Sequence, residues 1–252
     1  MKAIFVVGTA GSGKSLLASK MREHYTASGA FVASVNLDPG VEGLPYTCDV
    51  DVRDHVDIVS IMRRHGLGPN GALVVANDLV ASKIGDVWAE ANAVNPDYAI
   101  VDTPGQIELF AYRASGPFIA TGIDADERAC AFLFDGMLVN SPANFVSIAL
   151  LAESVRLRLS MPTVNALTKS DMAPSSAEEA VLWSEDTSAL AGALARDAAG
   201  ESLELSTAIL RGLDSAGLAP GITPVSSVTG DGLVTLWASL ARAIDGGEEV
   251  ID

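Results

Sequence analysis

The stretch Gly8-Thr9-Ala10-Gly11-Ser12-Gly13-Lys14-Ser15 matches the pattern G-x-x-x-x-G-K-[ST], and it directly follows the apolar run AIFVV at 3–7. An apolar run without alternation is typical of a parallel strand that is buried on both faces. Beyond the glycines, apolar residues recur at helical spacing and predict a helix over 15–27. A strand, a glycine-rich loop and a helix in this order predict a phosphate-binding loop at the end of a central strand.

Each part of this loop has a role in holding a triphosphate. Glycine lets the backbone turn its N–H groups onto phosphate oxygens, and the following helix adds the positive end of its dipole. We expect Lys14 to reach the β- and γ-phosphates as a catalytic residue, and the Ser15 hydroxyl to bind Mg²⁺. The nucleotide contacts predicted for the loop are Gly11, Ser12, Gly13, Lys14, Ser15 and Leu16. The alternative is a glycine-rich turn that merely joins a strand to a helix.

The loop does not by itself choose between a hydrolase and a nucleotide kinase. ATPases of the ParA and MinD type carry a signature lysine where this chain has Thr9, which argues against that family. Nucleotide kinases need clustered arginines to hold two nucleotides, and the arginines of this chain are scattered. A hydrolase is therefore favoured, with a P-loop ATPase or a nucleotide kinase as the alternatives.

The same order of strand and helix recurs along the chain. Further strands are expected at 31–35, 98–101, 129–134, 162–167 and 222–226, and further helices at 54–65, 71–93, 108–120, 142–159 and 231–244. Such alternation predicts an α/β protein with the three-layer P-loop NTPase fold, in which helices cover both faces of a mostly parallel sheet. The 252 residues fit a single domain, 1–252, with insertions at about 54–93 and, helical in character, at about 174–219. The acidic tail at 246–252 is expected to fray.

Composition excludes several classes of function. The formal net charge of −16 repels nucleic acid and anionic membrane surfaces, so we expect neither as a partner. The acidity itself is compatible with a salty cytoplasm or with a basic protein partner. Cys48 and Cys130 are too few for a disulfide framework or a zinc site and are expected to be reduced. The apolar start of the chain is too short for a signal sequence, and no apolar run is long enough to span a membrane, so we expect a soluble, cytoplasmic protein.

A second motif, D-x-x-G, follows the strand expected at 98–101. Asp102 would hold Mg²⁺ through its water shell, and the Gly105 N–H would contact the γ-phosphate and sense its loss. Gln106 and Glu108 come next and are candidates to orient or polarise the attacking water. The alternative for Asp102 is an ordinary cap between a strand and a helix.

A further carboxylate, Asp38, follows the strand expected at 31–35 in the sequence Asn36-Leu37-Asp38-Pro39-Gly40. Since the carboxyl ends of parallel strands meet at one edge of the sheet, Asp38 is expected beside the phosphate loop. It is a candidate for a second metal-shell carboxylate or a catalytic, water-activating one. An Asx-Pro turn is the alternative.

The strand expected at 162–167 ends in Thr168-Lys169-Ser170-Asp171, which resembles the N/T-K-x-D signature of GTPases. A carboxylate at Asp171 would accept from N1–H and the exocyclic amine of guanine, while the Lys169 stem lies on the base. Thr168 stands where Asn is more common. After the last strand, the segment Ser226, Ser227 and Val228 resembles the loop that contacts guanine O6 through backbone N–H groups. GTP and GDP are therefore the expected substrate and product.

The tripeptide Gly68-Pro69-Asn70 lies in the long stretch between Lys14 and Asp102. With GTAGSGKS, LDPG, LGPNGAL, DTPGQIELF, TKSD and SSVTG, it makes nearly the whole chain similar to the GPN-loop GTPases. The resemblance implies a fold of the signal-recognition-particle type and a homodimer in which the Gly68, Pro69 and Asn70 loop reaches the partner's nucleotide site. Eukaryotic members are associated with RNA polymerase assembly and its nuclear import, so protein partners are expected.

Without the resemblance, Gly68 to Gly71 is simply a good β-turn. The apolar segment at 71–80 suits a dimer interface, but a buried core would look the same. Two functions stay open at this point. One is a GTP-hydrolysing switch that assists the assembly of partner proteins, and the other is a nucleotide-gated scaffold with incidental turnover.

Overall fold

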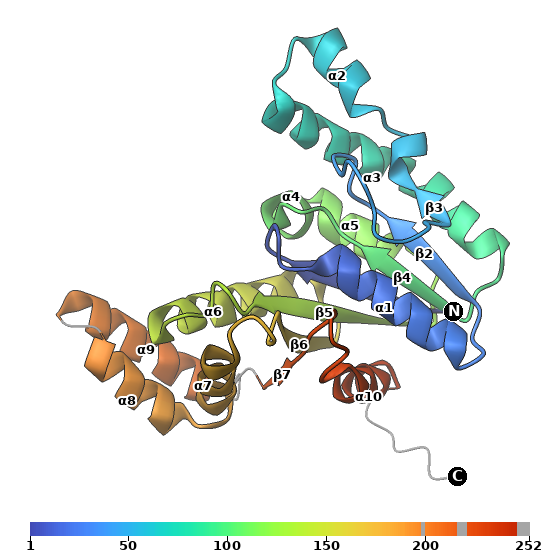
Figure 1. Cartoon of the computed structure of the whole chain (residues 1–252). Helices are drawn as coiled ribbons and strands as arrows, with labels where there is room; N and C mark the ends of the chain where they lie inside the picture. Colours follow the sequence, from blue (N-terminus) through green and yellow to red (C-terminus); the bar gives the residue numbers. More distant parts are fainter. Residues whose placement is uncertain (198–199, 216–220, 246–252) are drawn as a thin grey trace.

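A computed structural model of the chain describes residues 1–197, 200–215 and 221–245 (Figure 1). The acidic tail at 246–252 and the end of the expected helical insertion at 216–219 lie outside the described residues. No helix in the described part of the chain is both long enough and apolar enough to cross a membrane.

One sheet of seven strands organises the described part of the chain. Its strands are β1 (Lys2–Gly8), β2 (Val32–Asn36), β3 (Val50–Asp51), β4 (Tyr98–Asp102), β5 (Glu127–Asp135), β6 (Thr163–Thr168) and β7 (Ile222–Pro224). They lie in the order β3-β2-β4-β1-β5-β6-β7, and every neighbouring pair is parallel. The carboxyl ends of all strands therefore point to one edge, where each functional motif follows its strand.

Helices cover both faces of this sheet. The helices are α1 (Lys14–Ala27), α2 (Ile58–His65), α3 (Pro69–Ala93), α4 (Ile107–Ala111), α5 (Ser115–Gly122), α6 (Pro142–Leu159), α7 (Pro174–Glu185), α8 (Thr187–Asp197), α9 (Glu201–Ser215) and α10 (Leu233–Ile244), with a 3₁₀ turn at Val52–Asp54. Side chains of α1 and α10 share one buried cluster with one face of β1. Those of α3 to α6 pack on the opposite face, so the expected three layers are confirmed.

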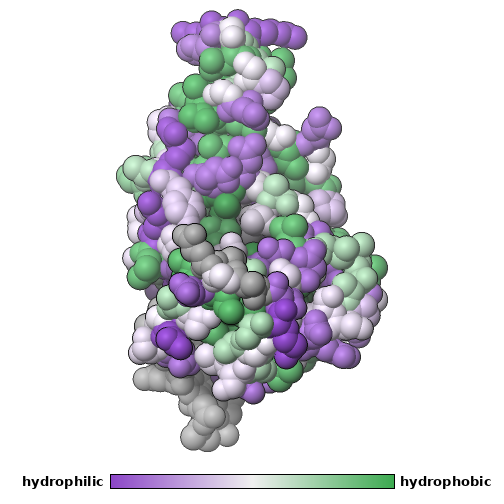
Figure 2. Space-filling model, turned by 90° about the vertical axis from the view of Figure 1, so that its left-hand side faces the viewer, coloured by the Kyte–Doolittle hydropathy of each residue, from purple (hydrophilic) through white to green (hydrophobic). Residues whose placement is uncertain are grey.

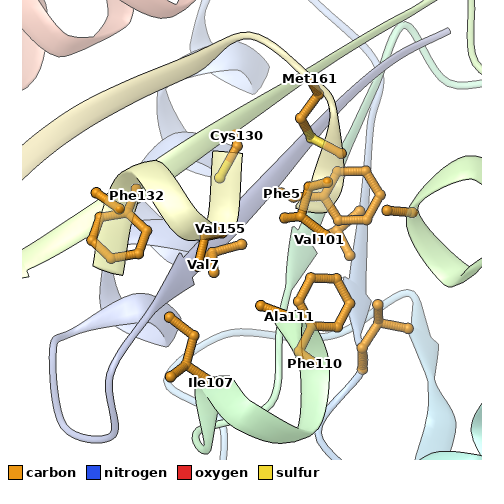
Figure 3. Packing of buried hydrophobic residues seen from close by; sticks show 14 of the residues in the cluster. Phe5, Val7, Val101, Ile107, Phe110, Ala111, Cys130, Phe132, Val155 and Met161 are labelled. Carbon is orange, nitrogen blue, oxygen red and sulfur yellow. The ribbon is translucent and has the colours of Figure 1, made fainter. Parts of the chain in front are cut away.

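The central strand β1 anchors the phosphate loop from both faces of the sheet. Phe5 packs on Phe110 (Figure 3). Phe5 also lies edge-on against Trp88, so β1, α4 and α3 share one core. On the other face, Ile4 and Val6 are fully buried against α1 and α10. A strand buried on both faces cannot shift without opening both cores, which fixes the loop that follows it.

Several expected boundaries were wrong. The helix expected at 108–120 is two helices, α4 and α5, because the Gly116 backbone passes so close to Phe110 O that a Cβ there would lie 1.5 Å away. Pro117 follows, and it cannot donate to a continuous helix. The helix expected from 54 begins at Ile58, where the Asp57 carboxylate accepts from the N–H groups of Val59 and Ser60. The two-residue strand β3 was not expected at all.

The expected helical insertion at 174–219 is helical over its described residues, in α7, α8 and α9. Both cysteines are free thiols, as expected. Burial raises the pKa of Cys130 to about 12 and that of Cys48 to about 11, so both thiols are protonated near neutral pH.

Candidate functional site

The backbone of the phosphate loop has the conformation of an anion-binding loop. Gly11 and Gly13 have φ of 77° and 92°, a region that only glycine enters without strain. Gly13 is also the N-cap of α1, which brings the positive end of that helix to the loop. The hydroxyl oxygens of Thr9 and Ser12 are buried without a hydrogen-bond partner. A loop with left-handed glycines and unpaired donors suits a ligand rich in acceptor oxygens, such as a phosphate.

Lys14 lies inside this loop. Its ammonium donates to the carbonyl oxygens of Gly8 (3.1 Å) and Thr9 (3.0 Å), and the residue is only 6% exposed. Burial lowers the pKa of Lys14, and the nearby carboxylates of Asp102 and Asp38 act in the opposite direction. The ammonium therefore lies between the phosphate loop and the two acidic positions predicted from the sequence.

Asp102 ends β4 directly beside the loop and is 2% exposed. Its Oδ2 accepts from the Tyr46 hydroxyl at 3.2 Å, whereas Oδ1 is buried and has no hydrogen-bond partner within the part of the chain that the structure describes. Burial raises the pKa of Asp102 to about 6, and Asp38 adds to this, while Ser15, Lys14 and Tyr46 oppose it. Burial also raises the pKa of Tyr46, so its hydroxyl stays a donor.

These residues fit Mg²⁺ bound together with a nucleotide. No group of three or more His, Cys, Asp or Glu side chains that could hold a metal occurs among the described residues, so a stand-alone metal cage is absent there. Mg²⁺ instead favours one or two protein oxygens, phosphate oxygens and water. The Oδ1 of Asp102 and the neighbouring Ser15 hydroxyl are oxygens of that kind, and their roles in holding Mg²⁺ stay predictions. When bound, the ion would neutralise charge on the β- and γ-phosphates.

Asp38 connects two of the predicted motifs. Its Oδ2 accepts from the N–H of Gly105 at 2.9 Å, and its Oδ1 accepts from the N–H of Gly40 at 2.9 Å. The N–H expected to contact a γ-phosphate is thus held by a carboxylate in this structure. Asp38 is a candidate to move when a nucleotide binds, and its roles in the metal shell and in water activation stay predictions.

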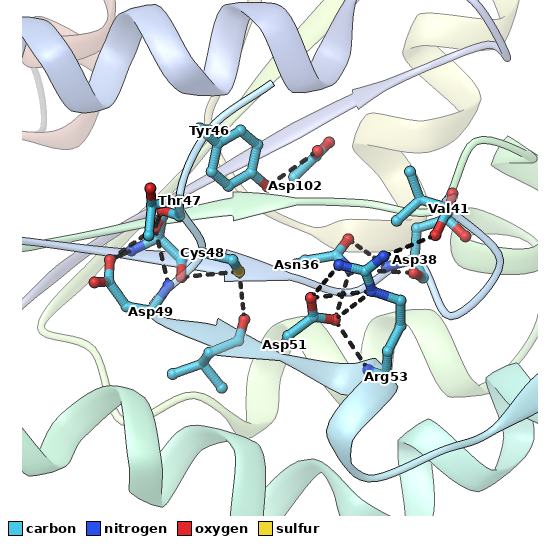
Figure 4. Close-up of polar contacts among 12 residues, drawn as sticks. Asn36, Asp38, Val41, Tyr46, Thr47, Cys48, Asp49, Asp51, Arg53 and Asp102 are labelled. Atoms are coloured by element: carbon cyan, nitrogen blue, oxygen red, sulfur yellow. Dashed lines mark hydrogen bonds and ion pairs between the residues drawn. The ribbon is translucent and has the colours of Figure 1, made fainter. Parts of the chain in front are cut away.

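A buried polar network fixes the backbone around Asp38 (Figure 4). The side chain of Asn36 accepts from the Asp38 N–H at 3.0 Å and donates to the Asp38 carbonyl at 3.2 Å. The same amide donates to Asp51, which forms an ion pair with Arg53. Burial acts to raise the pKa of Asp51, but the hydrogen bonds from Arg53 and Asn36 outweigh it and keep that pKa below its usual value.

The expected base-reading loop contacts the phosphate loop directly. The Thr168 hydroxyl is buried and donates to the carbonyl oxygen of Ser12 at 2.8 Å. Lys169 has a φ of 58° and its ammonium lies 2.7 Å from Asp135 Oδ2, while Asp171 is exposed. Thr168 therefore ties the two loops together, and Asp171 is left accessible to a base.

The loop after β7 lies alongside. The Ser226 side chain is fully buried and accepts from the N–H groups of Val228 (3.2 Å) and Thr229 (3.1 Å), which folds the loop into a tight turn. The N–H of Ser170 donates to the carbonyl of Val225 at 3.3 Å, so this turn abuts the Thr168 loop. Ser227 is partly buried and Val228 is 76% exposed.

Comparisons with known proteins agree with this geometry. A family profile described as "Conserved hypothetical ATP binding protein" matches residues 6–246. The chain is 35% identical over 195 residues to GPN-loop GTPase QQT2 of Arabidopsis thaliana, covering 76% of this chain and 51% of that protein. It is 29% identical over 257 residues to GPN-loop GTPase 1 of Saccharomyces cerevisiae, covering 97% of this chain and 66% of that protein. The apo crystal structure of a GTPase from Pyrococcus abyssi matches with a TM-score of 0.84 at 28% identity, covering 96% of this chain and 97% of that one.

The chain belongs to the GPN-loop GTPase family. It spans about half the length of the first curated relatives that it matches. The tripeptide that gives the family its name starts a helix here, rather than forming the isolated β-turn that turn chemistry alone predicted. Gly68 is the N-cap of α3 and Pro69 is its first residue, a position where the missing N–H of proline does no harm.

Asn70 is exposed in the first turn of α3. The amino end of α3 lies on the same side of the molecule as the loop between β1 and α1 (Figure 1). One turn later, Leu73 lines a cavity of about 200 Å³ together with Ala10, Asp38, Gly40, Pro104, Gly105, Gln106 and Leu109. This cavity is where the phosphate loop, Asp38 and the D-x-x-G segment of this family member meet.

The two candidates for orienting water differ in their placement. Gln106 is partly buried and lines the cavity, whereas Glu108 is exposed on the first turn of α4. Two further residues at the site were not expected from the sequence, Tyr46 beside Asp102 and Asp135 beside Lys169. Asp135 carried a signal, because it directly follows the strand expected at 129–134. Tyr46 lies in an irregular segment and carried none.

Proposed function

We propose that this chain binds GTP with Mg²⁺ and hydrolyses it to GDP and phosphate. The observation that carries the proposal is the hydrogen bond from Thr168 to Ser12 O, which joins the expected base-reading loop to the phosphate loop. A nucleotide whose phosphates lie in the loop at 8–15 would thereby bring its base to Asp171. A carboxylate at that position complements the N1–H and exocyclic amine of guanine, and adenine offers no such pair of donors.

The chain's own residues provide the elements of phosphoryl transfer. Lys14 is a buried cation at the phosphate loop, and Asp102 and Ser15 are the oxygens for the metal. Gln106 lines the adjoining cavity, which supports its proposed role in orienting a water molecule. If Asp38 released the Gly105 N–H, this N–H could donate to the γ-phosphate. The positions of the Asp38 segment and of the D-x-x-G segment would then depend on which nucleotide is bound.

We further propose that the protein acts as a homodimeric switch, in which this coupling changes the shape that is offered to partner proteins. Support comes from α3, where Leu73, Val74 and Val75 are only partly buried and Leu79 is 42% exposed. Figure 2 views the side on which the phosphate loop lies, and hydrophobic residues form a broken band there from the upper part toward the middle. A nucleotide-gated scaffold with incidental turnover is the alternative, and it predicts that GTP- and GDP-bound states bind the same partners.

Nucleotide preference tests the proposed activity. We expect the wild-type protein to bind GTP on the order of 10²-fold or more tightly than ATP, because adenine would leave the Asp171 carboxylate unpaired. Asp171→Asn should shift preference toward xanthosine triphosphate, since an amide can donate to the xanthine carbonyl. Titration calorimetry and phosphate release would measure both, with Lys14→Ala as the control that loses binding or turnover whatever the base.

Two outcomes would contradict the proposal. Equal affinity for ATP and GTP would instead favour an ATP-binding protein, which is how the matching family profile is described. Near wild-type binding and turnover in a folded Lys14→Ala protein would show that the loop does not hold the phosphates.

A further inference from the structure

The segment 41–49, here called the strap, crosses from Asp38 to β3 and is held at several points (Figure 4). The Arg53 guanidinium donates to the Val41 carbonyl at 3.0 Å at one end. At the other end Arg22, from α1, donates to the Thr47 carbonyl and contacts Asp49. Asp49 Oδ2 also accepts from the Ser34 hydroxyl at 2.7 Å. An irregular segment with this many fixed points holds its side chains in place as a strand would.

One side chain of the strap, that of Tyr46, lies beside the position proposed for the metal. Tyr46 donates to Oδ2 of Asp102 at 3.2 Å, from a residue 56 positions away in the chain. The other carboxylate oxygen, Oδ1, is buried and has no hydrogen-bond partner among the residues that the structure describes. One oxygen of Asp102 is thus held by a phenol, while the second is left for a ligand. This is the arrangement that orients a carboxylate toward a cation.

We propose that Tyr46 is a positioning residue for the Mg²⁺ ligand Asp102. The proposal rests on the proposed function, because it assumes that Mg²⁺ is bound there with a guanine nucleotide. The phenol fixes the rotation of the carboxylate and keeps its second oxygen aimed away from the strap. Without the hydroxyl, the carboxylate gains rotational freedom that Mg²⁺ binding must remove again, and its buried Oδ2 loses its donor.

Replacing Tyr46 with Phe tests this with almost no change of shape. Groups that orient a metal ligand typically contribute 10–100-fold to metal affinity. We therefore expect Tyr46→Phe to raise the Mg²⁺ concentration for half-maximal binding of a non-hydrolysable GTP analogue by about 10–100-fold. Affinity for the same analogue in EDTA should stay unchanged. Both are binding measurements and do not depend on turnover.

Tyr25→Phe is the matched control. The Tyr25 hydroxyl is buried in the core between α1 and α10 and, unlike that of Tyr46, has no hydrogen-bond partner among the described residues, so its loss changes a buried phenol away from the metal position. Tyr25→Phe should leave the Mg²⁺ requirement at the wild-type value. A second arm places p-aminophenylalanine at position 46, where its amino group can still donate, and most of the Mg²⁺ affinity should return.

Three outcomes would overturn the proposal. In one, Tyr46→Phe needs no more Mg²⁺ than wild type. In another, it needs less, which would mean that Tyr46 competes with the ion. In the third, it weakens binding equally in Mg²⁺ and in EDTA, which would mean a general structural role. Failure of the proposed function looks different, because the wild-type protein itself would then show no Mg²⁺-dependent binding of the GTP analogue.

Discussion

Asp102 is a buried carboxylate whose ionisation opposes the stability of the free protein. Its burial raises the carboxyl pKa to about 6 from the usual 3.8, so the folded chain holds the proton more tightly than the unfolded chain. Stability is therefore lost as pH rises from about 4 through about 6 and stays reduced above that range. The proposed role of Asp102 in binding Mg²⁺ accounts for this cost, because Mg²⁺ requires an ionised oxygen.

A first residue-scale prediction follows for Asp102→Asn. In the absence of Mg²⁺ and nucleotide at pH 7, we expect the free energy of unfolding to increase by about 1–3 kcal/mol, because a buried charge is removed. The gain should shrink as pH falls toward 5. Chemical denaturation at several pH values would measure it, with the exposed Asp124→Asn as control. A destabilised Asp102→Asn at pH 7 would contradict this account of the buried carboxylate.

The site residues that could be predicted from the sequence are those that belong to a local sequence motif next to a strand. Lys14 and Ser15 follow a strand and a glycine loop, and Asp102 ends a buried strand, so position in the fold could be inferred from neighbours in the chain. Tyr46 could not be found in this way. Its contact with Asp102 depends on how Arg22, Arg53 and Ser34 hold the strap. These contacts leave no periodic pattern in the sequence from which they could be predicted.

At the scale of elements, the loop between β7 and α10 depends on one glycine. Gly232 has a φ of 73°, and a Cβ on it would lie 1.9 Å from the Pro224 carbonyl oxygen. Gly230 has a similar φ of 90° but nothing within 4 Å of a Cβ. Substitution at Gly230 therefore measures the strain of the backbone conformation alone, whereas substitution at Gly232 measures that strain together with the clash with β7.

We expect Gly232→Ala to destabilise the protein by more than Gly230→Ala, whose strain alone is worth about 1–2 kcal/mol. It should also weaken GTP binding, because the clash displaces the turn that holds Ser226, Ser227 and Val228. Thermal unfolding and nucleotide titration on both variants would show the difference. Equal effects of the two substitutions would mean that the approach to Pro224 O does not shape this loop.

The predicted boundaries of helices and strands are correct where they follow a start or stop signal in the sequence, and wrong where they ignore one. The strands β1, β4 and β6 lie within a residue or two of their expected positions because each is a short apolar run. The break between α4 and α5 had a signal in Gly116-Pro117, and the start of α2 had one in Asp57. The strand β3 has only two residues, too few for any pattern.

At the scale of the whole molecule, a chain with net charge −16 is proposed to hold a polyanion. The two facts are compatible because salt screens charges beyond about 8–10 Å, whereas the phosphate loop acts at contact distance. Lys14 and the N-terminus of α1 lie at that short range. The sequence shows no evident arginine finger for the transition state, so we expect a donor of another kind from a second copy of the chain.

The last prediction concerns Asn70, which we expect to act across a homodimer on the γ-phosphate or attacking water of the opposite subunit. Asn70 is exposed at the start of a helix that Pro69 stiffens, and α3 carries partly exposed apolar residues that a second subunit would cover. Loss of one preorganised neutral donor typically lowers the rate about 10²–10³-fold. Asn70→Ala should therefore reduce turnover strongly in phosphate-release assays, while titration shows nearly unchanged GTP affinity.

A mixing experiment separates action in trans from action within one subunit. Asn70→Ala and Lys14→Ala proteins are each expected to be inactive, but a mixed dimer keeps one site with an intact phosphate loop and an intact incoming Asn70. Part of the activity should therefore return on mixing, in proportion to the heterodimer measured by native mass spectrometry. If heterodimers form and the mixture is no more active than its components, Asn70 does not act across the interface. The Gly68-Pro69-Asn70 segment would then serve only to begin α3, a structural role for which its N-cap and first-turn proline are sufficient.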